Sequence, residues 1–172
     1  MANWQHCPAV ERASGQDGGL WMFKGTDVPL YHLYERLADG GTVDDFATRH
    51  GVDVEMAAAA LEYEADELHD YRLDYAGRVP FARNIDPAHL RPDNTLWGNC
   101  PLVEQAEGRL GGAWVFKHSR LALYVLHYHL AGGRTLDEFD EWYGMDTSKA
   151  VAVLQHEAKV LERAQPAHAD IV

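Results

Sequence analysis

Two cysteines carry the most reactive side chains in this sequence. Cys7 and Cys100 each stand directly before a proline, and a cysteine thiolate is one of the groups that bind haem iron. Thiolates form where a lysine, an arginine or the start of a helix lies beside the sulfur, and neither cysteine has such a neighbour in the sequence. A small buried thiol is therefore the simpler interpretation of both residues.

Histidines supply the other candidate metal ligands, among them His32 and His127. His127 and His129 lie two positions apart in a predicted helix, so their side chains point to nearly opposite sides and cannot bind one metal ion together. His32, Tyr34, His127 and Tyr128 would converge only if the helices that carry them meet. We expect no cofactor, with a haem or transition-metal centre built from these histidines and the two cysteines as the alternative.

A lysine ends the same predicted strand in both halves of the chain, at Lys24 and Lys117. Its aliphatic stem would cover the nearby indole ring of Trp21 or Trp114. The segment from Lys24 to Thr26 also precedes a predicted helix, where backbone N–H groups favour an anion. The sequence contains no glycine-rich phosphate loop, nucleophile elbow or His-Glu-x-x-His pattern, so a protein without catalytic activity is favoured.

The sequence contains an internal repeat with a constant offset of 93 residues, as from Trp4 to Trp97. The register holds without a gap through the glycine-rich segment before Trp21 and through the helical region that follows. Unrelated segments would not keep so many matches at one offset, so the two halves are predicted to share one fold. Identical pairs include Cys7 and Cys100, Pro8 and Pro101, Val10 and Val103, Glu11 and Glu104, Trp21 and Trp114, and Phe23 and Phe116.

The repeat sets the predicted domain organisation. Residues 1–69 form the first repeat and residues 97–163 the second. Residues 70–96 contain prolines and several charges, which is typical of a connector, and residues 164–172 are expected to form a flexible tail. The two repeats are expected to pack about a pseudo-two-fold axis, as a monomer or in a dimer.

Each repeat is predicted to be mainly α-helical, with one short β-hairpin before three helices. Aromatic and β-branched residues around Trp21 and Trp114 favour the hairpin strands. Thr42 and Thr135 are predicted N-caps of the second helices, because acidic residues follow them in the first turn. In the first repeat the three helices are expected near residues 28–38, 43–50 and 54–69.

The second and third helices of each repeat, joined at Gly51 or Gly144, have the arrangement of a helix-turn-helix. The outward face of the third helix in the first repeat is acidic, at Asp53, Glu55 and Glu62. Acidic side chains offer no donor to phosphate, and the formal net charge of −12 repels DNA as a whole. Alanine-rich helical hairpins also pack in this way in proteins that bind no DNA.

The first repeat resembles the domain of unknown function 433 family. The resemblance is carried by the run from Gly19 to Thr26, the Val28-Pro29 pair and the helical segment from Leu33 to Leu61. The resemblance extends to both repeats and is closer in the first. Members are similar to the antitoxins of toxin–antitoxin pairs, have a homeodomain-like fold, and often occur beside a ribonuclease toxin of the PIN-like class. The resemblance therefore implies a small regulatory protein rather than an enzyme.

The resemblance also implies the partners of such a regulator, a ribonuclease-type toxin and, as a further ligand, DNA. The alternative function is that of a metal- or haem-binding enzyme or sensor, with His32, His127, Cys7 and Cys100 as candidate ligands at the seam between the repeats. The candidate residues for binding nucleic acid or a partner are basic and polar: Lys24, Thr26, Lys117, Arg120, Thr147, Ser148, Lys149 and Gln155.

The composition predicts a soluble, cytoplasmic protein. A hydrophobic share of 47% suffices for packed cores, whereas apolar runs such as Leu121 to Leu126 are far shorter than the roughly 20 residues of a membrane-spanning helix. The N-terminus lacks a basic region followed by an apolar stretch. Two cysteines are too few for a disulfide framework, which favours a reducing compartment.

Overall fold

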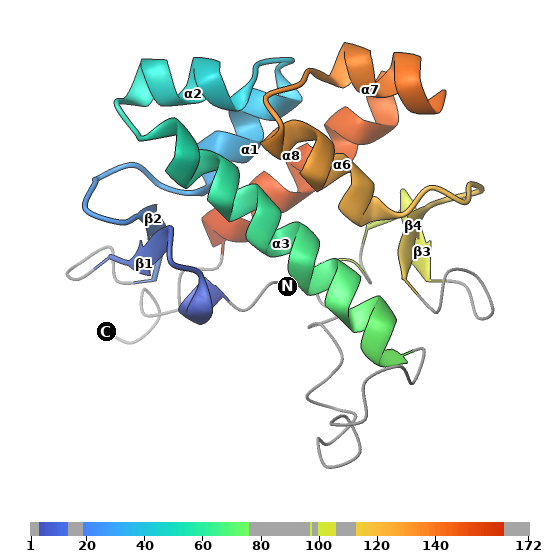
Figure 1. Cartoon of the computed structure of the whole chain (residues 1–172), viewed down its shortest axis with the longest axis horizontal. Coiled ribbons are helices and arrows are strands. Elements are labelled where there is room, and N and C mark those ends of the chain that lie inside the picture. Colours follow the sequence, from blue (N-terminus) through green and yellow to red (C-terminus); the bar gives the residue numbers. More distant parts are fainter. Residues whose placement is uncertain (1–3, 14–18, 76–96, 98–99, 106–112, 164–172) are drawn as a thin grey trace.

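The computed structural model describes residues 4–13, 19–75, 97, 100–105 and 113–163. In the first unit, residues 4–75, a 3₁₀ turn (Trp4–His6) precedes β1 (Val10–Arg12), β2 (Trp21–Phe23), α1 (Tyr31–Ala38), α2 (Val43–His50) and α3 (Val54–Tyr75). The order returns in the second unit, residues 97–163, as β3 (Val103–Gln105), β4 (Trp114–Phe116), α6 (Leu123–Ala131), α7 (Leu136–Tyr143) and α8 (Thr147–Arg163). The fold is mainly α-helical with two small antiparallel hairpins, as predicted (Figure 1).

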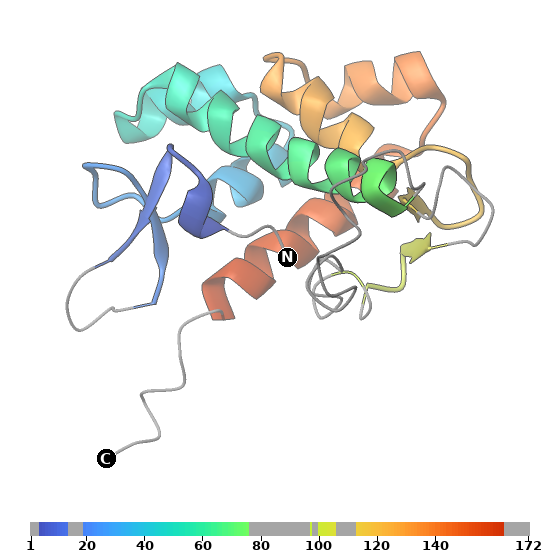
Figure 2. The ribbon, with the colours of Figure 1, turned by 60° about the horizontal axis from the view of Figure 1, so that its bottom comes forward.

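The two hairpins have the same register. Val10 of β1 pairs with Phe23 of β2, and Val103 of β3 pairs with Phe116 of β4. Both residues of the second pair lie one repeat offset after those of the first. Both phenylalanines are fully buried, and each packs against a phenylalanine of the second helix in its own unit, with ring centroids 5.4 and 6.2 Å apart. The hairpins themselves lie at opposite ends of the molecule (Figures 1 and 2).

The second helix of each unit begins with the same capping box. The hydroxyl of Thr42 accepts a hydrogen bond from the backbone N–H of Asp45, whose carboxylate accepts the N–H of Thr42 in return. Thr135 and Glu138 form the same reciprocal pair at α7. The predicted N-caps are therefore confirmed, and these bonds satisfy donors that a helix start leaves open. Both helices end at a glycine in the left-handed conformation, Gly51 (φ 67°) and Gly144 (φ 62°).

Each unit packs its first helix against the third helix of the other unit. α1 lies along α8, and α3 lies along α6 (Figures 1 and 2). The second helices, α2 and α7, pack on the third helices of their own units and lie on the same side of the molecule (Figure 1). Neither unit therefore encloses its core alone.

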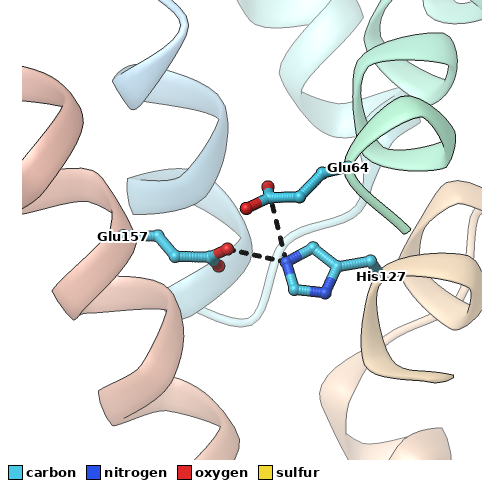
Figure 3. A group of neighbouring side chains, drawn as sticks. All are labelled: Glu64, His127 and Glu157. Atoms are coloured by element: carbon cyan, nitrogen blue, oxygen red, sulfur yellow. Dashed lines mark hydrogen bonds and ion pairs between the residues drawn. The ribbon is translucent and has the colours of Figure 1, made fainter. Parts of the chain in front are cut away.

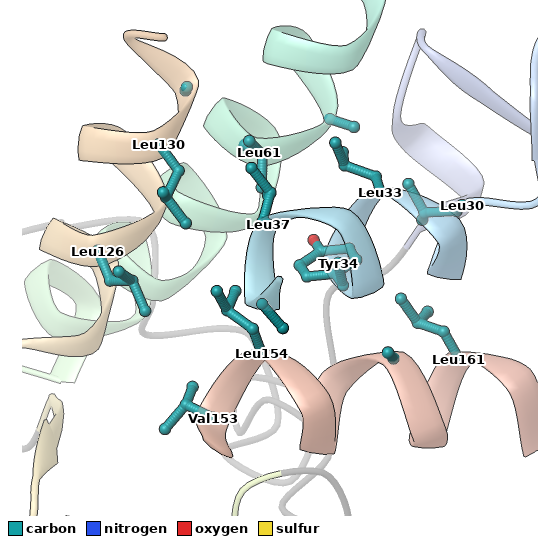
Figure 4. Close-up of a cluster of buried hydrophobic side chains, with 14 of the residues drawn as sticks. Leu30, Leu33, Tyr34, Leu37, Leu61, Leu126, Leu130, Val153, Leu154 and Leu161 are labelled. Atoms are coloured by element: carbon teal, nitrogen blue, oxygen red, sulfur yellow. The ribbon is translucent and has the colours of Figure 1, made fainter. Parts of the chain in front are cut away.

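The core that the units share is built mainly from leucines of α1, α3, α6 and α8, the four helices that pack across the units (Figure 4). Burying one leucine contributes about 1.5–3 kcal/mol, so these side chains dominate the cohesion between the units. The fully buried residues of this cluster include Leu30, Leu33, Tyr34 and Leu37 of the first helix and its start, Leu61 of α3, Leu126 and Leu130 of α6, and Val153 and Leu154 of α8.

α3 is longer than the sequence patterns indicated. We expected its end near His69, but it continues to Tyr75, through the first positions assigned to the connector 70–96. No glycine or proline interrupts this stretch before Gly77, so nothing local stops the helix. Although α3 is long, neither it nor any other described helix has the apolar length that crossing a membrane requires. The remaining connector, 76–96, and the predicted tail, 164–172, lie outside the described residues.

Candidate functional site

The seam between the two units contains three buried ionisable side chains, which we call the seam cluster (Figure 3). Glu64 extends from α3, His127 from α6 and Glu157 from α8, and their exposed fractions are 3%, 0% and 1%. Nε2 of His127 lies 2.7 Å from Oε1 of Glu157 and 3.5 Å from Oε2 of Glu64. Within the described part of the chain, these are the His, Cys, Asp or Glu residues that bring three potential ligand atoms within 4.8 Å of one another.

The seam cluster is made of equivalent positions of the repeat. Glu64 and Glu157 differ by 93 residues, and so do Tyr34 and His127. The Tyr34 hydroxyl donates a hydrogen bond to Oε2 of Glu64, as Nε2 of His127 does to Glu157. The two aromatic rings have centroids 6.4 Å apart. Each unit thus contributes one ring donor and one carboxylate, and the pairs meet where the units cross.

The two glutamates were missed by the sequence analysis, although their positions carry a signal. Glu64 falls on the same face of α3 as Ala57, Ala60, Leu61 and Leu68, all of which are buried. A carboxylate at helical spacing within an apolar stripe is expected to be buried and therefore to have a partner. Its recurrence at the same repeat position, as Glu157, repeats that signal.

Burial and mutual repulsion set the protonation of the seam cluster. Burial raises the pKa of Glu157 well above its usual value, and the negative charge of Glu64 raises it further. Burial alone would lower the pKa of His127, but the charges of Glu157 and Glu64 outweigh it and raise that pKa to about 9. Without other ions the cluster therefore favours a protonated histidine and one protonated carboxyl, which leaves no net charge in the core.

Tyr34 keeps its proton in this setting. Burial raises the pKa of its hydroxyl well above the usual value, and the negative charge of Glu64 adds to that effect. The hydroxyl is therefore a permanent donor to Glu64 and fixes the orientation of that carboxylate.

The orientation of the His127 ring is fixed from its other side. Its Nδ1 lies 3.2 Å from the backbone oxygen of Leu123, to which it donates, and the Trp97 ring lies edge-on with its centroid 6.5 Å away. Nε2 therefore faces the two carboxylates. Oε2 of Glu157 has no hydrogen-bond partner among the described residues, and leaving a buried acceptor unsatisfied costs about 1–3 kcal/mol.

Of the four side chains that would converge only if their helices met, the structure brings two together. Tyr34 and His127 meet at the seam, whereas the His32 ring lies against Tyr31 and His50, with centroids 4.5 and 5.6 Å away. Tyr128 instead donates its hydroxyl proton to Asp66 on α3. Both of these ring neighbours of His32 belong to the first unit.

The two cysteines are buried with free thiols. Burial raises the pKa of both Cys7 and Cys100, and the hydrogen bonds from nearby backbone N–H groups only partly offset this effect. The thiol form is therefore favoured over the thiolate that a haem or metal centre would require. The structure agrees with the interpretation of both residues as small buried hydrophobic groups.

The turn after β2 uses its polar groups internally. The Thr26 hydroxyl donates to the backbone oxygen of Phe23 and accepts the N–H of Val28. The backbone N–H of Gly25, expected to favour an anion, donates to the carboxylate of Glu11. The ring of Trp21 is covered by Arg12, whose guanidinium carbon lies 4.9 Å from the ring centroid.

The candidate binding residues lie on separate elements. Lys24 and Thr26 follow β2, and Lys117 and Arg120 follow β4, in hairpins at opposite ends of the molecule (Figure 1). The other candidates belong to α8: Thr147, Ser148 and Lys149 at its first turn, and Gln155, which is exposed beside α1 in a hollow of about 380 Å³.

The C-terminal half of α7 exposes two large aromatic side chains, Trp142 and Tyr143, with exposed fractions of 53% and 44%. Asp140 and Glu141 precede them and are exposed as well. The guanidinium carbon of Arg134 lies 4.1 Å from the Trp142 ring centroid, so the cationic guanidinium covers one face of the indole ring. We call residues 140–143 the α7 patch.

The α7 patch has no counterpart in the first unit. The equivalent residues at the end of α2, 47–50, read Ala-Thr-Arg-His, whereas residues 140–143 read Asp-Glu-Trp-Tyr. The exposed residues therefore differ between the units, weakly basic in the first and acidic and aromatic in the second. The buried position directly before them is a phenylalanine in both units, Phe46 and Phe139.

One family model matches part of this chain. Comparisons with curated proteins and with solved structures gave no match. The family match begins in β1, ends within α3 and covers only the first unit. Residues 10–63 match the model of a family described as Protein of unknown function (DUF433).

Proposed function

We propose that this chain is a non-catalytic regulatory protein that binds a basic protein partner, as the antitoxin of a toxin–antitoxin pair binds its toxin. The α7 patch is the main contact surface in this proposal. The observation that carries it is the exposure of Trp142 and Tyr143 within an acidic surface. Tryptophan and tyrosine are enriched among residues that dominate protein–protein binding energies.

The charge of the molecule supports a basic partner. Asp137, Asp140 and Glu141 are exposed on α7 together with the two aromatic rings. The formal net charge of −12 attracts basic proteins and speeds their association at low salt. A ribonuclease-type toxin fits this description, because an enzyme that binds RNA presents a basic surface to phosphates.

The third helices favour a protein partner over DNA. Asp53 is exposed just before α3, Glu55 in its first turn, and Glu62 farther along it. The first turn of α8 exposes Ser148, whose backbone N–H is already bonded to Asp146. Lys149 is the one cation in that turn, and one phosphate contact gives little affinity at physiological salt.

Co-expression with each protein encoded beside this gene tests the proposal. One neighbour is expected to inhibit growth when expressed alone and to copurify with this chain when both are present. Trp142→Ala is expected to weaken that complex by at least about 10-fold in a calorimetric titration, because it truncates a central aromatic contact. Arg49→Ala is the matched control, since Arg49 is the equivalent exposed position in the first unit, and it should leave the affinity unchanged.

Two results would contradict the proposal. One is a complex whose affinity is the same for Trp142→Ala and for the unaltered chain. The other is a salt-sensitive gel shift of the DNA upstream of its own gene at physiological salt, combined with no complex with either neighbour. That second pattern would assign the helix-turn-helix-like units to DNA.

A further inference from the structure

We propose that Glu64, His127 and Glu157 bind one divalent transition-metal ion, such as Zn²⁺, at the seam between the two units. One ligand would come from each of α3, α6 and α8 (Figure 3). This site is independent of the α7 patch and of the partner proposed above.

The spacing of the donor atoms fits a small metal ion. Zinc lies about 2.0–2.2 Å from histidine nitrogen and carboxylate oxygen, so two ligands of a tetrahedral site lie roughly 3.4 Å apart. The distance from Nε2 of His127 to Oε2 of Glu64 is 3.5 Å, and all three ligand atoms lie within 4.8 Å of one another. Only the 2.7 Å contact between Nε2 and Glu157 must open, by a rotation of the carboxylate.

The hydrogen bonds around His127 are those of a metal ligand. A histidine that binds metal through one nitrogen nearly always donates the other N–H to a carbonyl or carboxylate, which fixes the ring. Nδ1 of His127 donates to the backbone oxygen of Leu123, and Nε2 faces the two carboxylates. A single proton on Nε2 cannot bond well to both carboxylates, whereas one metal ion can contact both.

The buried carboxylate of Glu157 supplies a second, independent observation. Its Oε2 is buried and has no hydrogen-bond partner among the described residues, although buried carboxylate oxygens are normally paired. A metal ion bound through Oε2 would give that oxygen a partner.

Charge and ligand type indicate the class of metal. Two carboxylates and a neutral imidazole neutralise a divalent cation, so the occupied site would add no net charge to the core. One nitrogen and two carboxylate ligands suit Zn²⁺, Mn²⁺, Fe²⁺ or Co²⁺, while Mg²⁺ prefers an all-oxygen shell that retains several waters. Tyr34 is a positioning residue, because its hydroxyl orients Glu64.

A bound ion would join the two units, since Glu64 belongs to one unit and His127 and Glu157 to the other. The full-length chain, stripped with a chelator and then desalted, provides the test when it is titrated separately with Zn²⁺, Co²⁺ and Mg²⁺. One Zn²⁺ or Co²⁺ per chain should survive desalting, and the melting temperature should rise by roughly 5–10 °C at 100 times the Kd. Mg²⁺ should do neither.

Variants then locate the bound ion. Glu157→Gln and Glu64→Gln keep the side-chain shape, and one of the two carboxyls is already neutral in the chelated chain, so each single variant should melt no lower than the chelated parent. Both should lose the retained ion and the metal-dependent rise in melting temperature. Glu62→Gln, an exposed carboxylate on α3, is the matched control and should behave as the parent does. Tyr34→Phe should weaken Co²⁺ binding about 10–100-fold and keep a stoichiometry of one.

Failure of the unaltered chain to retain Zn²⁺ or Co²⁺ would overturn this assignment whatever the variants do. Equal retention by the parent, Glu64→Gln and Glu157→Gln would overturn it too, because the ion would then lie elsewhere. A large loss of stability in the chelated glutamine variants, with no metal effect on the parent, would identify the cluster as a purely structural ion pair.

Discussion

At the scale of single residues, one equivalent position has the same backbone conformation in both units but a different residue type. The turn after β2 places Gly25 at φ 74°, and the turn after β4 places His118 at φ 64°. Both backbone N–H groups donate to a glutamate in the first strand of their hairpin, Glu11 of β1 or Glu104 of β3. The left-handed conformation is open to glycine and costs a residue with a Cβ about 1–2 kcal/mol. The second unit therefore keeps the turn at a cost in strain.

Replacing His118 by glycine should stabilise the protein. The side chain is exposed, so its removal loses little packing, and relief of the strain outweighs the greater freedom of glycine in the unfolded chain. The free energy of unfolding in urea should rise by about 0.5–1 kcal/mol. Gly25→Ala is the converse control: an added Cβ meets no atom within 4 Å, so a loss of about 1 kcal/mol would come from the backbone alone. A lower stability for His118→Gly would show that its side chain has a stabilising contact.

The seam cluster shows how far single residues could be predicted from the sequence. The sequence allowed Tyr34 and His127 to meet only if the helices that carry them came together, and the structure brings the two rings together. Glu64 and Glu157 were not anticipated, because their burial depends on helices of the opposite unit. The pattern within α3 shows which face is apolar, but not that α6 covers it.

At the scale of elements, local sequence signals were sufficient for the hairpins and for the caps of the second helices. The hairpins, the capping threonines and the terminal glycines are determined by residues within a few positions, and the structure has them where the patterns placed them. The end of α3 could not be located in that way, because helix-compatible residues continue into the segment that was assigned to the connector. Which helix packs against which was also beyond local signals, since the crossing of the units is a tertiary property.

The capping box of α7 gives the element-scale prediction. Thr135→Ala removes the hydroxyl that accepts the N–H of Glu138, so the unfolding free energy should fall by about 1 kcal/mol. Thr135→Ser retains an acceptor and should recover most of that loss. Hydrogen exchange should show faster opening of α7 in the alanine variant and unchanged protection in α2, which has its own cap at Thr42. Equal stability of the alanine and serine variants would mean that the observed hydrogen bond contributes nothing measurable.

At the scale of the whole molecule, the two units complete each other. α1 packs on α8 and α3 on α6, so the main apolar faces of each unit are buried by the other. The same crossing brings three ionisable groups into the core, where a buried charge must have a partner. The surface, by contrast, is where the units have diverged, as the α7 patch shows. The core thus largely preserves the repeat, with the buried Tyr34 and His127 as an exception, and the α7 patch distinguishes the two copies on the exterior.

The most direct test of this arrangement is a double-mutant cycle between Glu64 and His127, which belong to different units. Unfolding free energies would be measured in urea, with a chelator present, for Glu64→Gln, His127→Gln and the double variant. Contact across the seam predicts a coupling energy of roughly 0.5–3 kcal/mol. Effects that add within experimental error would show that the two side chains do not meet, and would contradict the crossed packing of the units.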